Sequence, residues 1–92
     1  MEIVKNNNFF ESLDLILDYI FQDSVNRWLK FNNDLDEKIY NLDFMPYSHR
    51  QSIFFDIDNV RDLIFKWYVI PFKIDEDKKK IIILDIINYK NK

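Results

Sequence analysis

The sequence contains no cysteine, glycine, alanine or threonine, and it has only two prolines and one histidine. Without cysteine the chain forms no disulfide bond and no thiolate metal site, and the single His49 is too little for a zinc site. No apolar run approaches the roughly 18 residues of a membrane span, and the start "MEIVKNNN" lacks the layout of a signal peptide. We therefore expect a cytoplasmic protein without metal, cofactor or membrane contact.

The absence of glycine has a structural consequence rather than a functional one. The chain is crowded with Ile, Lys, Asn, Asp and Phe, a composition that indicates the nucleotide bias of an AT-rich, bacterial genome. Backbone positions with positive φ normally use glycine, because it has no Cβ to clash. In this sequence we expect asparagine or aspartate at such positions, since they are the next most tolerant residues.

The residues that are present fit one globular domain spanning residues 1–92. This length is just enough to bury a modest core. The 48% hydrophobic and 17% aromatic content suits a packed chain rather than a disordered one. The net charge is −3, whereas proteins that grip the nucleic-acid backbone usually carry a clear basic excess. The charge balance therefore gives no support to such a function.

Two amphipathic helices are predicted in the first half of the chain. In residues 9–22 the apolar side chains recur at the spacing of one helical stripe: Leu13, Ile16, Leu17, Ile20 and Phe21. Asn8 is the expected N-cap, with Glu11 completing a capping box and, with Asp14, making the helix start acidic.

Asp23 or Ser24 is the expected N-cap of the second helix. This helix has a similar apolar spacing, carried by Val25, Trp28, Leu29, Leu35, Ile39 and Leu42. Pro46 should end the helical pattern and bias Met45 towards extended backbone. Two helices joined by so short a turn predict a helical hairpin.

The second half of the chain has the residue composition of β-strands. After a first strand at residues 2–5, we expect strands at residues 52–55, 61–66, 68–74 and 79–89, separated by the polar turns "DIDN" and "DEDK". Pro71 should occupy a sheet edge or a position that makes no ladder bond. The order predicts an α+β fold, in which an N-terminal strand and a helical hairpin pack on one face of an antiparallel sheet.

Several of these segments together carry a family resemblance. They are "L-x-x-x-P" at residues 42–46, "R-x-L" at 61–63, "Y-x-I-x-F-x-I" at 68–74 and an aliphatic last strand at 81–87, with "DYIFQDS" as the turn between the helices. In this order they resemble the RelE/ParE superfamily of toxins over essentially the whole chain. The resemblance implies a RelE/ParE-like fold and the toxin of a bacterial type II toxin–antitoxin pair, neutralised by a small cognate antitoxin.

The same resemblance leaves the mode of action open. RelE-like members cleave messenger RNA in the ribosome, ParE-like members bind and poison DNA gyrase, and a non-toxic relative would only bind its antitoxin. Gyrase binding requires a surface but no proton-transfer groups, so the acidic charge is no obstacle to it. We lean on that ground towards the ParE-like mode.

A nuclease would need a cation to stabilise the phosphorane and groups that exchange protons. The candidates are Arg61, His49 and Tyr89. Where related nucleases often carry arginine and histidine, this chain has Val69 and Asn88, and a neutral Asn cannot shuttle a proton. These departures weaken the ribonuclease alternative.

The predicted partner-binding residues are Arg50, Arg61, Lys73 and Trp28. Arg61 can clamp a phosphate, pair with an acidic antitoxin tail, or pair inside the fold with Asp56, Asp58 or Asp85. Trp28 can be core packing or an exposed anchor, since tryptophan is enriched at binding hot spots. We expect a partner strand or amphipathic helix to bind at the open sheet edge or in a groove beside the helical hairpin.

Overall fold

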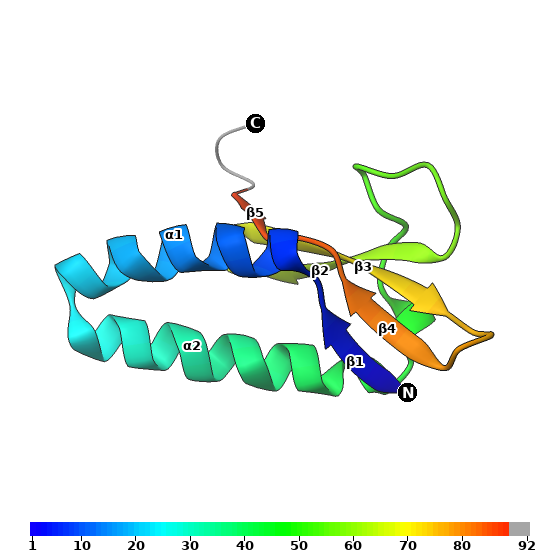
Figure 1. The fold of residues 1–92 in the computed structure, drawn as a ribbon, viewed down its shortest axis with the longest axis horizontal. Helices are drawn as coiled ribbons and strands as arrows, with labels where there is room; N and C mark the ends of the chain where they lie inside the picture. Colours follow the sequence, from blue (N-terminus) through cyan, green and yellow to red (C-terminus); the bar gives the residue numbers. More distant parts are fainter. Residues whose placement is uncertain (89–92) are drawn as a thin grey trace.

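The computed structural model describes residues 1–88, which form a strand, a pair of helices and then further strands (Figure 1). β1 spans Glu2–Lys5, α1 spans Asn7–Asp23, α2 spans Val25–Tyr40, and two short 3-10 helices follow, η1 at Asn41–Asp43 and η2 at Pro46–Ser48. The later strands are β2 (Val60–Phe65), β3 (Tyr68–Asp75), β4 (Lys80–Ile83) and β5 (Ile87–Asn88). The predicted α+β class is confirmed. Within residues 1–88, neither helix has the length and hydropathy that a membrane crossing requires.

The sheet has the strand order β1-β4-β3-β2, and β5 pairs with β3 beyond the end of β4. The β2–β3, β3–β4 and β3–β5 pairs are antiparallel, as predicted. β1 is different, because it runs parallel to β4, with Glu2 opposite Lys80 and Lys5 opposite Ile83. The first strand of the chain therefore forms an edge of the sheet by pairing with a strand near the other end of the sequence.

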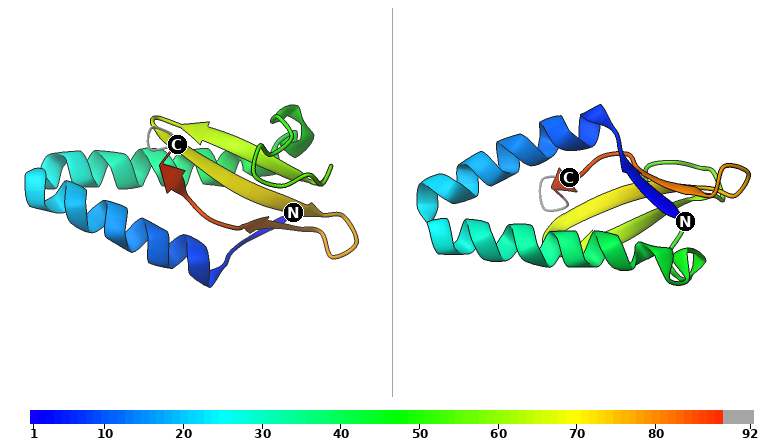
Figure 2. Two further views of the ribbon diagram at one scale, coloured as in Figure 1. Left: turned by 90° about the horizontal axis from the view of Figure 1, so that it is seen from above. Right: turned by 60° about the horizontal axis from the view of Figure 1, so that its bottom comes forward.

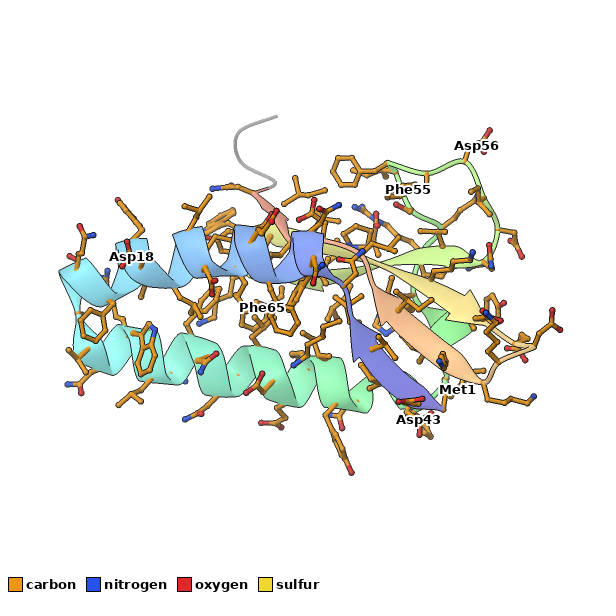
Figure 3. All side chains as sticks on the ribbon, in the orientation of Figure 1. Met1, Asp18, Asp43, Phe55, Asp56 and Phe65 are labelled. Atoms are coloured by element: carbon orange, nitrogen blue, oxygen red, sulfur yellow. The ribbon has the colours of Figure 1, made fainter. Side chains whose placement is uncertain are left out.

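The helical hairpin packs on one face of the sheet and encloses the core with it. Phe9 of α1 and Leu35 of α2 are fully buried, as are Ile70 and Phe72 of β3. Phe65 of β2, labelled in Figure 3, meets the ring of Phe31 edge-on, with ring centres 5.2 Å apart. The aromatic residues thus join the second helix to the sheet.

The first helix begins earlier than its sequence predicts. Asn6, not Asn8, is the N-cap, and its side-chain oxygen accepts a hydrogen bond from the N–H of Phe9 (3.0 Å). The predicted capping box and acidic first turn are therefore wrong, because Glu11 falls in the second turn. The earlier start places Phe9 in the core, and that burial selects one of three consecutive asparagines as the cap. Ser24 caps the second helix, as one of the two alternatives predicted.

The far end of the hairpin extends beyond the sheet, as both views in Figure 2 show. The predicted apolar stripe of α2 is wrong there, because Val25 and Leu29 are about half exposed (51% and 46%). Phe31 is buried instead, one and two helical turns before Leu35 and Ile39, over the part of the sheet that α2 covers. Side chains at the far end thus have no sheet to pack on, whatever their hydrophobicity.

The strand expected at residues 52–55 is not formed. Only Gln51 makes an isolated bridge, to Arg61, and residues 52–59 form a loop. The chain turns away at Ser52, whose N–H donates to the carbonyl of Val60 (2.9 Å). The next N–H, of Ile53, donates to the carboxylate of Asp62 (3.0 Å) and is no longer available for a ladder.

Positive φ occurs at Met45, Lys66 and Lys79, not at asparagine or aspartate as predicted. Lys66 forms the tight turn between β2 and β3, and Lys79 closes the turn before β4. Met45 takes the left-handed conformation (φ 50°, ψ 58°) instead of the extended one expected before Pro46. The aspartate of the β3–β4 turn has another task, because the Asp75 carboxylate accepts the N–H of Lys78 (3.1 Å).

Pro71 lies in β3, a central strand, and its position explains why the last predicted strand is split in two. The carbonyl of Pro71 accepts the N–H of Leu84 (2.9 Å), but proline has no N–H to return, and β4 has ended at Ile83. Between the Phe72–Ile83 and Val69–Ile87 pairs, two residues of β3 face residues 84–86 of the last segment. The proline thus occupies a non-bonding position, as predicted, next to a bulge.

Candidate functional site

The guanidinium of Arg61 is engaged by the neighbouring loops through all three of its nitrogens. Nε donates to the backbone carbonyl of Asp58 (2.9 Å) and Nη2 to its carboxylate (2.9 Å). Nη1 donates to the carbonyls of His49 (3.1 Å) and Tyr47 (3.4 Å), and the group lies 5.0 Å from the centre of the Tyr47 ring. The Arg61 side chain is only 16% exposed. The arginine therefore connects both ends of the segment that precedes β2, at residues 47–49 and at Asp58, to the sheet.

Arg50 neutralises a buried carboxylate beside this arginine. Nε and Nη2 of Arg50 each lie 3.3 Å from Oδ2 of Asp62, whose side chain is fully buried. The same oxygen accepts the N–H of Ile53, while Oδ1 has no hydrogen-bond partner among residues 1–88. Arg50 is 41% exposed, so its outer side faces solvent. Its role as a partner contact stays a prediction.

His49 packs against the sheet more closely than an exposed loop residue would. Its ring meets the ring of Phe72 edge-on, with centres 5.4 Å apart. Burial, followed by the positive charge of Lys38, lowers the pKa of His49 below its ordinary value. The imidazole lines a cavity of about 480 Å³ together with Arg50 and Lys38.

Acid–base catalysis needs proton-exchanging groups within hydrogen-bond reach of the reacting atoms. The hydrogen bond between Arg61 and His49 runs through the backbone carbonyl of His49, not through its ring. The third catalytic candidate, Tyr89, lies outside the described residues. Within residues 1–88, no group of three His, Asp or Glu side chains could hold a metal ion.

A second site lies between the helical hairpin and the β2–β3 turn, and has a volume of about 370 Å³. Its aromatic walls come from Tyr19 of α1, Phe31 of α2, Trp67 of the turn and Tyr68 of β3. The rings of Phe31 and Tyr68 meet edge-on, with their centres 5.6 Å apart, and form the floor of this site. We name this site the hairpin cleft.

The charged side chains of the hairpin cleft are mainly basic. Arg27, Lys30 and Lys66 line it, against the single carboxylate of Asp23. The ammonium of Lys66 lies over the Phe31 ring (5.6 Å from its centre), an arrangement that holds the charge at the rim. Burial, followed by the neighbouring Tyr19, raises the pKa of Tyr68, so its hydroxyl remains a neutral hydrogen-bond donor.

The other two predicted partner-binding residues lie elsewhere. Trp28 is half-buried and meets the ring of Phe21 edge-on at 5.7 Å, in a shallow groove that also contains Asp14 and Asp18. Lys73 is exposed on β3 beside the acidic β3–β4 turn. Lys73 thus lies near Arg61, since Tyr47 lines its groove and also contacts the Arg61 guanidinium, whereas Trp28 lies on the helical hairpin.

Sequence reasoning missed the residues of the hairpin cleft. Trp67 and Lys66 belong to "FKWY", where one lysine lies among three aromatic residues at a turn, and this clustering was an available signal. Two of the basic residues of α2, Arg27 and Lys30, are three positions apart and so share a helix face. Their approach to Trp67 depends on the tertiary fold, which periodicity does not reveal.

Together, the fold and these sites define a small α+β protein with a helical hairpin on one face of its sheet and an aromatic, mainly basic cleft beside that hairpin. The family model described as "ParE toxin of type II toxin-antitoxin system, parDE" matches residues 4–91, and the chain belongs to this family. It is therefore the toxin component of a type II toxin–antitoxin pair, as the sequence predicted.

A solved structure described as "Chromosomal ParDE TA system from P. aeruginosa" contains a chain with the same fold. The two chains share 24% sequence identity with a TM-score of 0.74, over 96% of this chain and 95% of the other. No curated protein matches the sequence.

Proposed function

We propose that this toxin inhibits DNA gyrase by binding to it, and that a cognate antitoxin suppresses the inhibition by binding the toxin. The observation that carries the proposal is the state of Arg61, the strongest candidate for a catalytic cation. Its guanidinium donates to three backbone carbonyls and one carboxylate of its own loops. These bonds use four of the five N–H donors of the guanidinium, so a bidentate contact with an RNA phosphate would require the group to give up at least one of them.

Inhibition by binding requires exposed anchors rather than proton-transfer groups, and the chain offers them in two regions. Large apolar side chains are more than a third exposed at the far end of the hairpin and on the loop before β2: Leu15, Tyr19, Phe21, Val25, Leu29, Ile53, Phe54, Phe55 and Ile57. Exposed apolar groups that cluster in this way typically mark protein-binding surfaces. Membership of the ParE family favours gyrase as the target over the ribosome.

The test compares replication with translation after the chain is induced in a bacterium. Incorporation of labelled thymidine should fall first, while incorporation of labelled methionine persists and transcripts stay intact. In vitro, the purified chain should inhibit supercoiling by purified gyrase, and the antitoxin encoded beside it should restore supercoiling. Early loss of protein synthesis with cut transcripts, and unimpaired supercoiling, would refute the proposal in favour of a ribonuclease.

A further inference from the structure

We propose that the hairpin cleft is the docking site for an acidic segment of the antitoxin, which inserts an apolar side chain between Trp67 and Phe31. This inference rests on the proposed function for the existence of an antitoxin partner. It goes further by assigning the surface and the chemistry of the segment that binds there.

The charge of the cleft indicates an acidic occupant. The whole chain carries a net charge of −3, yet the cleft is lined by three basic side chains and one acidic one. A local excess of one sign on a chain of opposite net charge favours a partner of complementary charge, which it also helps to orient. An acidic segment is therefore attracted to this cleft although the chain as a whole is negatively charged.

The basic side chains of the cleft can exchange their present partners for the carboxylates of an acidic segment. Arg27 and Lys30 are each 74% exposed, and they pair within α2 with Asp23 and Asp34. Asp34 also lies 3.8 Å from the ammonium of Lys66. Exposed ion pairs of this kind contribute about 0–1 kcal/mol each, so carboxylates of a partner can replace them without unfolding the helix.

The aromatic side chains indicate an apolar anchor between those carboxylates. Trp67 is 61% exposed at the tip of the β2–β3 turn, and Tyr19 is 76% exposed on the facing helix. Tryptophan, tyrosine and arginine are the residues most enriched among binding hot spots, and this cleft combines all three. Its volume of about 370 Å³ suits one or two large side chains rather than a whole strand.

The test uses the full chain and the antitoxin product of the adjacent reading frame, with affinity measured by calorimetry. Trp67→Ala should weaken binding about 30-fold, the loss typical of a tryptophan hot spot. Tyr40→Ala is the matched control, because it removes an aromatic ring that is 78% exposed at the last residue of α2, outside the cleft, and it should stay within about threefold of wild type. Equal affinities for Trp67→Ala and wild type would overturn the inference.

Charge reversal gives a second, independent measurement. Arg27→Glu with Lys30→Glu should weaken binding at least roughly tenfold and reduce its dependence on salt. The matched control is Lys78→Glu with Lys79→Glu, which changes the net charge equally on exposed positions of the β3–β4 turn. If the control pair weakens binding more than the cleft pair, the acidic segment docks elsewhere and the inference is wrong.

The fluorescence of Trp67 reports occupancy directly. The chain has two tryptophans, so a Trp28→Phe variant leaves Trp67 as the only emitter. Its emission should shift to shorter wavelength when the antitoxin, or a synthetic acidic peptide from it, covers the indole. An unshifted spectrum at saturating antitoxin would contradict docking in the cleft.

Two further outcomes would assign the cleft to another occupant and overturn the inference. One is competition by a single-stranded RNA oligonucleotide for the cleft, and the other is a Trp67-dependent dimer in sedimentation. Failure of the wild-type chain to bind the antitoxin would instead refute the proposed function. Wild-type binding that survives every cleft substitution would leave the proposed function intact and remove only the docking site.

Discussion

Replacement of Arg61 by alanine tests whether this arginine acts on the fold or on a substrate. The substitution removes the donors of two short hydrogen bonds to backbone carbonyls, at 2.9 and 3.1 Å. Each contributes about 0.5–1.5 kcal/mol to stability. The contact with the Tyr47 ring adds about 0.5–1 kcal/mol, and the pair with the 86% exposed Asp58 carboxylate adds little. We expect the free energy of unfolding to fall by about 2–3 kcal/mol, which lowers the Tm by roughly 10–20 °C in a domain of this size.

The measurement is urea unfolding followed by tryptophan fluorescence, with the slope m compared between variants to confirm that the same surface unfolds. Arg27→Ala is the matched control, because Arg27 is also paired with an aspartate but is 74% exposed. Its removal should cost less than about 0.5 kcal/mol. If Arg61→Ala unfolds at the same urea concentration as wild type yet loses toxicity, Arg61 acts on a substrate or partner and the structural interpretation is refuted.

Three other predictions concern the fold. The folded-state pKa of His49 lies below its unfolded value of 6.5, so the unfolded chain binds the proton more readily and stability should fall as the pH drops below about 6.5. Urea midpoints measured at several pH values should depend less on pH in His49→Gln than in wild type. Lys79→Gly relieves a left-handed residue but loosens the unfolded chain, so the free energy of unfolding should rise by about 0.5 kcal/mol; a decrease in thermal unfolding would show that the Lys79 side chain has another role. Phe9→Ala, at a fully buried ring, should cost about 3–5 kcal/mol, while Phe10→Ala, whose ring is 47% exposed, should cost much less; equal losses would contradict the assigned start of α1.

Local patterns were enough to predict the helical hairpin and most of the sheet. The two helices and the cap at Ser24 follow from the residues of short segments, and the structure confirms them, whereas the predicted apolar stripes fail at Phe21, Val25 and Leu29. The pattern failed where a distant contact decides the outcome. Asn6, Asn7 and Asn8 are equivalent as caps by propensity, and only the burial of Phe9 selects Asn6. The apolar segment at residues 52–55 has strand composition, but the Asp62 carboxylate takes the N–H of Ile53.

The candidate sites were likewise predictable only where a short segment carries the signal. Arg61 stood out in the sequence, and an internal pair with Asp58 was one of its predicted alternatives, which the structure confirms. Its bonds to the carbonyls of Tyr47 and His49 were not predictable, since backbone acceptors leave no mark in a sequence. The hairpin cleft joins Arg27 to Trp67, forty positions away, and only the packing of α2 against the β2–β3 turn brings these residues together.

The parallel pairing of β1 with β4 determines when the toxin can finish folding. Residues 2–5 pair with Lys80–Ile83, and residues 6–79 lie between the two strands. Contacts between such distant segments form slowly because the whole intervening loop must close first. The antiparallel pairs β2–β3 and β3–β4 join neighbouring segments, so the toxin adds β1 to its sheet after them.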